Sequence, residues 1–476
     1  METQNKMAGL QGSLGVMGVV LMVLAQAAPL TVMAGTGPLM IGLGNGIGVP
    51  MTSVVVGCAL LLFAFGFVAM SKYIEGSGAF YAYILKGMGP VTGIGGAAVA
   101  VVSYTLVLLA LEVFLSILVK DAVERWVDVN LHWSIYTSAI ILVIGVLGYR
   151  NIEASAKVLG VALVAEIAII IVADIVVFWQ HGLAGLDPTP LLPSSFMSGN
   201  PGIGILFTVL CFVGFEATVV YREEVKDPNR TIPLATYYSI IIIVVLYCVS
   251  FYLTIIGIGV DDVVKQALSN TEYMYIDFVG HYMGKVAQDI ANILVITSLF
   301  SAALANHNVI ARYKYVLGRS SVINPRFSDV HHVHGSPHRA SFTQTLTALA
   351  LVVGSVVFNL DPIKEVYTWG SAAGTLGYML IITLTALSVI LFFRKDSRAV
   401  PVWNSKIAPY LSLICLVGFL HLALVNISAL TGSQGWNFVN ISIVAVVVGT
   451  FVIGATRGLY LKCLSPLRLV QVCERV

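Results

Sequence analysis

Charged residues are scarce in this 476-residue sequence, where they make up only 11% and hydrophobic residues make up 58%. An ordinary soluble protein carries about 25% charged residues. No Asp, Glu, Lys or Arg occurs between Lys6 and Lys72, a stretch far longer than the apolar region of a signal peptide. These absences argue against a soluble globular enzyme. They predict a polytopic membrane protein whose N-terminus is retained and whose first helix is an anchor.

Signals for several other kinds of site are also missing. The net charge is only +2 and the basic residues are scattered between apolar runs, so we expect no nucleic-acid partner. The six cysteines show neither a disulfide framework nor metal-type Cys/His spacing. Four histidines share one loop and could bind a metal, although a solvated loop is the more ordinary interpretation. They are His331, His332, His334 and His338. We therefore expect no metal and no cofactor.

Apolar runs long enough to cross a bilayer predict about twelve transmembrane helices. We place them near 14–42, 49–70, 90–118, 133–149, 157–179, 201–221, 234–257, 287–311, 341–359, 369–391, 408–428 and 438–456. With the N-terminus in the cytoplasm, all but five of the 26 Lys and Arg residues fall on the cytoplasmic side. The exceptions are Lys120, Arg125, Lys265, Lys285 and Lys364. The positive-inside rule therefore predicts that both termini are cytoplasmic.

Two of the predicted spans contain residues that interrupt a helix. Pro29 lies near the middle of the first span, where it should leave carbonyls near 25–28 and amides near 30–32 without helical partners. A kinked helix repaired by its neighbours is the alternative. The sixth span carries Gly214 in its interior, directly before a carboxylate, Glu216. Interrupted spans at corresponding positions of two halves are typical of secondary transporters built from inverted repeats.

This pattern predicts the organisation of the chain. We expect a cytoplasmic N-terminus (1–13), a first repeat of five helices (14–179), a second repeat (201–391), two further helices (408–456) and a cytoplasmic tail (457–476). The two repeats show no convincing residue-level similarity. Their existence is inferred from the number of spans and from the two interruptions.

Five carboxylates fall inside the predicted spans. They are Glu112, Glu166, Asp174, Glu216 and Asp289. Asp174 and Asp289 lie nearer the outer interface, where we expect water to reach them. A lone carboxylate in hydrocarbon is costly and marks a substrate, ion or proton site by default. The alternative is a protonated carboxyl that is hydrogen-bonded between helices.

The residues around the sixth span resemble those of the amino acid-polyamine-organocation superfamily. The superfamily pattern is Gly-Phe followed by Glu or Asp, then after a short gap Glu-Glu, then Asp or Asn followed by Pro-x-Arg-x-Ile-Pro. This chain matches it with residues 214–216, 223–224 and 227–233. The exit of the eighth span is similar too, although Ser320 replaces the usual Asp after Gly318-Arg319. The stretch 28–32 resembles the first-helix motif of bacterial amino acid and putrescine permeases. The resemblance covers roughly residues 10–400.

The resemblance implies an all-α fold of the LeuT type, with five plus five inverted helices, discontinuous helices 1 and 6, and two added helices. It implies a small amine-containing solute moved by alternating access. The solute carboxylate is expected at the amides of Leu30, Thr31 and Val32, and the solute amine at carbonyls near Ala27 and near 211–213. Half-helix ends suit these two charges. The binding residues implied are Ala27, Ala28, Pro29, Leu30, Thr31, Val32, Cys211, Phe212, Val213 and Gly214.

The resemblance also suggests roles for four side chains within the spans. Glu216 matches the sixth-helix carboxylate and is the best candidate for proton coupling or gating. Glu166 stands where several proton-coupled members carry a lysine, so it is either a protonatable substitute or a structural residue. His307 falls where members place pocket residues, and Glu112, which has no usual counterpart, could attract a cationic solute group. Ser103 replaces an Asp expected in putrescine permeases, which argues against a diamine.

These observations favour a proton-coupled carrier that imports an amino acid, neutral rather than cationic, across a bacterial inner membrane. A polyamine or monoamine carrier and an amino acid/amine exchanger are the close alternatives. An intramembrane enzyme would need a nucleophile–base pair or metal ligands at membrane depth, and we find neither. A passive channel would not explain two broken helices. The expected partners are the solute, protons and membrane lipid.

Overall fold

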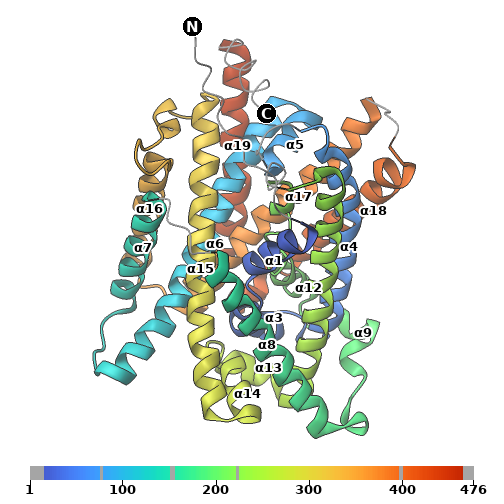
Figure 1. The fold of residues 1–476 in the computed structure, drawn as a ribbon, viewed down its shortest axis with the longest axis vertical. Helices are drawn as coiled ribbons and strands as arrows, with labels where there is room; N and C mark the ends of the chain where they lie inside the picture. The colour runs from blue at the N-terminus through green and yellow to red at the C-terminus, as the bar shows by residue number, and fades with distance from the viewer. Residues whose placement is uncertain (1–14, 75–78, 151–155, 221–224, 396–399, 465–476) are drawn as a thin grey trace.

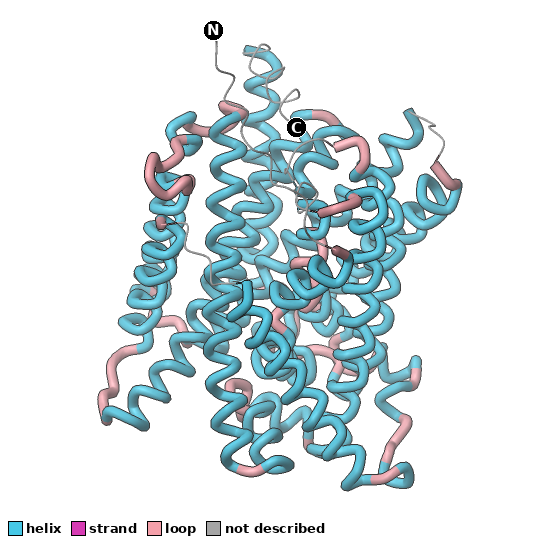
Figure 2. Tube along the Cα trace, in the orientation of Figure 1, coloured by secondary structure: helices cyan, strands magenta, loops and turns pink. Residues whose placement is uncertain are grey.

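The computed structural model describes residues 15–74, 79–150, 156–220, 225–395 and 400–464. Within these ranges the chain is almost entirely helical and contains no strand (Figure 2). Ten helices are long and apolar enough to cross a membrane, and two shorter apolar helices, Trp133–Tyr149 and Pro201–Leu210, lie at the predicted fourth and sixth spans. The protein is therefore an all-α polytopic membrane protein, as predicted.

The helices follow one another with short connections. Their bounds are α1 Val16–Ala27, α2 Pro29–Thr31, α3 Gly37–Gly42, α4 Val49–Ser71, α5 Ala79–Met88, α6 Pro90–Val127, α7 Trp133–Tyr149, α8 Ala156–His181, α9 Pro193–Phe196, α10 Pro201–Leu210, α11 Ala217–Val220, α12 Pro228–Ile258, α13 Val263–Ser269, α14 Met274–Met283, α15 Lys285–Arg319, α16 His338–Val357, α17 Thr368–Lys395, α18 Ala408–Val425 and α19 Phe438–Leu464.

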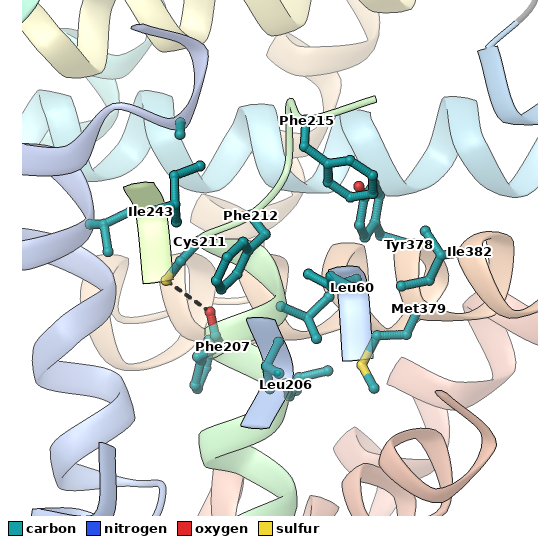
Figure 3. Close-up of a cluster of buried hydrophobic side chains, with 14 of the residues drawn as sticks. Leu60, Leu206, Phe207, Cys211, Phe212, Phe215, Ile243, Tyr378, Met379 and Ile382 are labelled. Atoms are coloured by element: carbon teal, nitrogen blue, oxygen red, sulfur yellow. Dashed lines mark hydrogen bonds between the residues drawn. The ribbon is translucent and has the colours of Figure 1, made fainter. Parts of the chain in front are cut away.

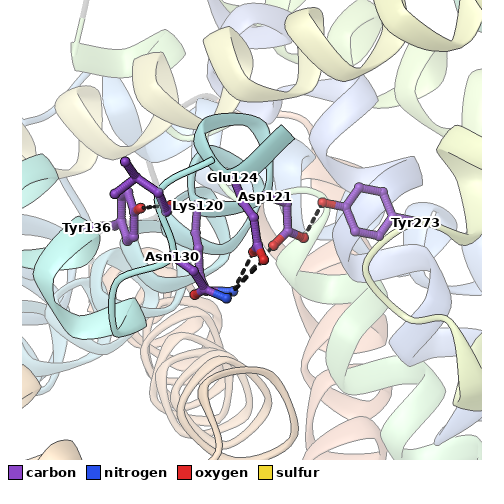
Figure 4. A network of polar contacts seen from close by, with 7 residues as sticks. Lys120, Asp121, Glu124, Asn130, Tyr136 and Tyr273 are labelled. Carbon is purple, nitrogen blue, oxygen red and sulfur yellow. Dashed lines mark hydrogen bonds and ion pairs between the residues drawn. The ribbon is translucent and has the colours of Figure 1, made fainter. Parts of the chain in front are cut away.

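The helix α6 is longer than its apolar run, because polar contacts continue it beyond the predicted end at 118. Lys120 and Glu124 form an i,i+4 ion pair of 3.5 Å, and Asn130 donates to Glu124 at 2.9 Å. The Tyr273 hydroxyl, from the segment before α14, donates to Asp121 at 2.6 Å (Figure 4). A hydropathy window marks only the apolar part of such a helix.

Long interior helices form the centre of the molecule and more exposed helices surround them (Figure 1). The most apolar window of Pro362–Lys395, which contains α17, is 78% buried, whereas that of Phe438–Cys463 in α19 is only 22% buried. The helix α6 packs against α5, α7, α15, α17 and α19. An apolar helix that leaves most of its surface uncovered is suited to lipid contact. The interrupted first and sixth spans lie among these interior helices.

Candidate functional site

The first span is interrupted where Pro29 predicted it. The helix α1 ends at Ala27, Ala28 adopts a left-handed conformation (φ 46°, ψ 68°), and α2 begins at Pro29. A residue with a Cβ in this conformation costs about 1–2 kcal/mol, so the surrounding structure must impose it. A π-helical turn, Val32–Thr36, then leads into α3. This span therefore consists of several short helical pieces.

One part of the backbone prediction at this interruption is wrong. The amide of Val32 donates to the carbonyl of Ala28 at 3.1 Å, so both groups have a hydrogen-bond partner. The sequence predicted that both would lack one. The hydrogen bond forms because the chain resumes helical geometry directly after Pro29, which closes a new turn across the break. The Leu30 amide lies within hydrogen-bonding range of the Glu166 carboxylate from α8.

The sixth span is interrupted between α10 and α11. The amides of Phe212 and Val213 bond three residues back, to Val209 and Leu210, at 3.1 Å each. Gly214 then has φ of 115°, which L side chains rarely adopt. A Cβ at Gly214 would lie 2.9 Å from Cγ of Gln26 in the last turn of α1. The predicted break is therefore present, and it faces the break in the first span.

The side chains at the sixth-span break are apolar and point into the protein core. Cys211, Phe212 and Phe215 are almost completely buried. Figure 3 shows them among apolar side chains, including Leu60 of α4 and Met379 of α17. The Cys211 thiol donates to the Phe207 carbonyl at 3.2 Å. This break therefore offers polar contacts mainly through its backbone.

Glu216, directly after this break, is a buried carboxylate with three donors. The Tyr104 hydroxyl of α6 donates to Oε1 at 2.6 Å, and the Tyr378 hydroxyl of α17 donates to Oε2 at 2.9 Å. The backbone amide of Gly214 donates to Oε2 at 2.9 Å. Charge-assisted bonds of this kind are stronger than neutral ones. Glu216 therefore connects the sixth-span break to two interior helices.

The close approach of α6 and α17 makes this arrangement possible. A Cβ at Gly377 would lie 2.0 Å from Oγ of Ser103, and one at Gly374 would lie 2.7 Å from the Ser103 carbonyl. These residues neighbour Tyr104 and Tyr378, so small residues at the contact bring both hydroxyls within reach of one carboxylate. The sequence patterns did not point to Tyr378 or Gln26. The pair Gly377-Tyr378 within a predicted span was the signal available for Tyr378.

A third tyrosine stands beside this group. The ring of Tyr313, from α15, lies 5.9 Å from the ring of Tyr104. Its buried hydroxyl has no hydrogen-bond partner among the described residues. A buried hydroxyl usually has a hydrogen-bond partner in a folded protein. Tyr313 therefore places a free hydrogen-bonding group next to the Tyr104–Glu216 pair. Part of the predicted motif beyond Glu216, residues 221–224, lies outside the described residues.

Glu166 is joined to the second part of the first span. Ser298 of α15 donates to its Oε2 at 3.0 Å, and Thr31 donates to the Ser298 hydroxyl at 3.0 Å. Only about 4% of Glu166 is exposed. The structure therefore brings Glu166, Thr31 and the Leu30 amide together.

His307 and Glu112, two other predicted site residues, make no hydrogen bond to either break among the described residues. The His307 ring of α15 contacts the Ser341 hydroxyl of α16 at 2.8 Å, and it would lie 2.7 Å from a Cβ at Gly148 of α7. Nine residues separate His307 from Ser298, which puts the two on opposite faces of α15. Glu112 is buried in α6, and neither carboxylate oxygen has a hydrogen-bond partner among the described residues.

The remaining two carboxylates differ from each other. Asp289 is exposed and pairs with Lys285 at 2.9 Å, in agreement with its expected position near water. The same expectation is wrong for Asp174, which is only 6% exposed and accepts a hydrogen bond of 2.6 Å from Ser250 of α12. Packing of α12 and α14 over α8 covers it. Among the described residues, no group of three or more His, Cys, Asp or Glu could hold a metal ion.

Comparisons with known proteins point to one family of membrane transporters. The model of the amino acid permease family matches residues 14–451. A chloroplastic cationic amino acid transporter of Arabidopsis thaliana is 27% identical over 60% of this chain and 52% of its own length. A methylthioribose transporter of Bacillus subtilis is 22% identical over 78% of this chain and 79% of its own.

A branched-chain amino acid permease of Bacillus subtilis is 25% identical over 60% of this chain and 59% of its own length. The chain spans only about half the length of the plant relative named above. The family match, in contrast, covers almost the whole chain and includes both interrupted spans. The chain therefore belongs to the amino acid permease family of the amino acid-polyamine-organocation superfamily.

Proposed function

We propose that the protein imports an amino acid across the cytoplasmic membrane by alternating access within a LeuT-like arrangement of its helices. One observation carries the proposal: the breaks of the first and sixth spans face each other, with Gly214 against Gln26. Irregular backbone at membrane depth is tolerated where it lines a protein-enclosed site. Opposed half-helix ends suit both charges of an amino acid.

The apolar side chains at the sixth-span break favour a neutral amino acid. Cys211, Phe212 and Phe215 offer no charge to a solute side chain, so recognition falls to the backbone. The branched-chain amino acid permease among the relatives supports this class. In this proposal residues 27–32 and 211–214 contact the solute, with the Val32 amide excluded because it bonds to Ala28.

Glu112 favours a second candidate, the transport of a cationic amino acid or an amine. Both of its oxygens are buried without a hydrogen-bond partner in the described structure. A buried carboxylate in this condition gains much from a cationic group brought by a solute. The name of the plant cationic amino acid transporter supports this candidate.

Protons are the proposed coupling ion, and Glu216 and Glu166 are the proposed carriers. Each is buried and each contacts one interrupted span, Glu216 through the Gly214 amide and Glu166 through Ser298 and Thr31. A change in protonation at either carboxylate would alter the hydrogen bonds that hold the break next to it. Proton binding and helix movement are thereby linked.

Radiolabelled uptake into proteoliposomes tests the proposal. The solutes are leucine, arginine and putrescine, each assayed with and without an inward proton gradient. The proteins are the wild type, Glu216→Gln, Glu166→Gln and Glu112→Gln. We expect saturable leucine uptake that the gradient stimulates and that Glu216→Gln uncouples. Arginine or putrescine uptake that Glu112→Gln abolishes would favour the second candidate. Uptake indifferent to the gradient would refute proton coupling.

A further inference from the structure

Asp174 is a buried carboxylate that the proposed function does not use. It lies on the same buried stripe of α8 as Glu166, because eight residues, or two successive i,i+4 steps, separate the two. At 1.5 Å per residue the separation is about 12 Å along the helix axis. Asp174 is the one nearer the end of α8 that carries His181.

The hydrogen bonds of Asp174 are incomplete. Ser250 donates to Oδ2 at 2.6 Å, whereas Oδ1 is buried and has no partner among the described residues. Two nearby helices present hydroxyls in the same condition. These hydroxyls belong to Thr254, one turn from Ser250 on α12, and to Tyr275 of α14. Tyr275 lies within electrostatic range of Asp174.

A further hydroxyl without a partner lies on the Ser250 face of α12. Tyr247 precedes Ser250 by one turn on the same face of α12, is fully buried, and has no hydrogen-bond partner among the described residues. It lies within electrostatic range of Glu166. Buried hydroxyls are normally hydrogen-bonded, so several unsatisfied ones near a buried carboxylate suggest groups that exchange partners.

The charged and titratable groups on the elements around Asp174 that could pair with it have partners of their own. On α8, His181 contacts the Val177 carbonyl at 3.1 Å, and on α14, Asp277 bonds to Asn270 and Gln288. On α15, Lys285 pairs with Asp289. The described parts of the first span that pack on α8, α1 and α2, contain no titratable residue. Within the described structure, no basic side chain is seen to neutralise Asp174.

We propose that Asp174, although buried, is a second proton-binding site on the outer side of Glu166, and that it exchanges protons with Glu166 along the face of α12 that carries Ser250 and Tyr247. The inference rests on the proton coupling in the proposed function. A proton from hydronium binds the Asp174 carboxylate and forms a carboxylic acid. The acid then releases that proton, the Glu166 carboxylate accepts it, and Asp174 is again ionised. One proton moves and no other bond changes.

The geometry favours a proton over a metal cation. A hard cation such as Na⁺ needs several oxygen ligands at once, often backbone carbonyls. Around Asp174 both α8 and α12 are regular helices, whose carbonyls bond within the helix. A carboxylate and separate hydroxyls are enough for a proton.

The test compares Asp174→Asn with Asp289→Asn, the same substitution at an exposed carboxylate on the same side of the protein. Proteoliposomes that contain a pH-sensitive dye report proton entry, and radiolabelled leucine reports uptake and counterflow. For Asp174→Asn we expect proton-driven accumulation to fall about tenfold or more, whereas counterflow, which needs no net proton movement, stays near the wild-type rate. Asp174→Glu should restore part of the accumulation.

Ser250→Ala keeps the carboxylate and tests the same site without removing it. Because the Ser250 hydroxyl donates to the ionised carboxylate, we expect its loss to move the pH of half-maximal uptake toward alkaline values. If the wild type is proton-coupled while Asp174→Asn and Ser250→Ala match Asp289→Asn, the inference fails and the proposed function stands. Sodium-driven uptake that Asp174→Asn abolishes would replace the proton with Na⁺. If the wild type shows no coupling at all, both proposals fail.

Discussion

The four buried carboxylates of the spans differ in how many hydrogen bonds they accept. Glu216 accepts three, whereas neither oxygen of Glu112 accepts one from a described residue. Burying an ionised group without partners costs far more than burying a satisfied one. The three donors therefore offset part of the cost of burying Glu216, and its two tyrosines become part of the site.

The Tyr378 hydroxyl can be removed with little change in shape by Tyr378→Phe. A hydrogen bond to a charged group contributes about 1.5–3 kcal/mol, so we expect a lower melting temperature in detergent and slower uptake. Tyr460→Phe is the matched control, because Tyr460 is 51% exposed on α19. If both variants melt at the same temperature, the Tyr378–Glu216 bond contributes nothing to stability.

At the scale of elements, the loop between α15 and α16 depends on a neutral histidine. Nδ1 of His331 accepts hydrogen bonds from the amides of Val333 and His334 at 3.2 and 3.3 Å. An acceptor nitrogen carries no proton, so the ring is in its neutral form. Partial desolvation, followed by the nearby charges of His334, His338 and His332, lowers the pKa of His331.

This lowered pKa gives the loop a pH dependence. Because the folded pKa lies below the unfolded value of about 6.5, the contribution of His331 is complete above about pH 6.5 and is lost as the pH falls through the folded value. Hydrogen exchange at residues 329–338, corrected for intrinsic rates, should show less protection at acid pH. His331→Asn, whose amide oxygen replaces Nδ1 and does not titrate, should remove this difference. Equal pH sensitivity in both proteins would contradict the assignment.

The sequence predicted the helix breaks because their causes are local. Pro29 lacks an amide hydrogen, and Gly214 allows a positive φ, so the position of each break is set by one residue. The contacts of the breaks depend on distant helices. The Tyr378–Glu216 hydrogen bond requires α17 to approach α6. The helix that the His307 side chain faces depends on the rotation of α15 about its axis. A hydropathy pattern contains neither quantity, which is why Tyr378 was missed and why the contact of His307 with Ser341 was not predicted.

At the scale of the whole molecule, the distribution of Lys and Arg predicts an orientation that the fold makes testable. The end of α19 and the connection between α6 and α7 lie at opposite ends of the helix bundle (Figure 1). Cys463 is exposed at the first of these positions, and Asn130 is exposed at the second. The positive-inside rule places Cys463 in the cytoplasm and Asn130 outside.

A membrane-impermeant maleimide distinguishes the two sides. One variant keeps only Cys463, and its matched control has Asn130→Cys as its only cysteine. We expect the control to react in right-side-out spheroplasts, and Cys463 to react only in inverted vesicles, because the reagent reaches water-exposed thiols on one side alone. The reverse pattern would mean that the chain is inserted in the opposite orientation. Asp174 would then lie on the cytoplasmic side of Glu166, so this measurement also decides on which side of the membrane the proposed proton route begins.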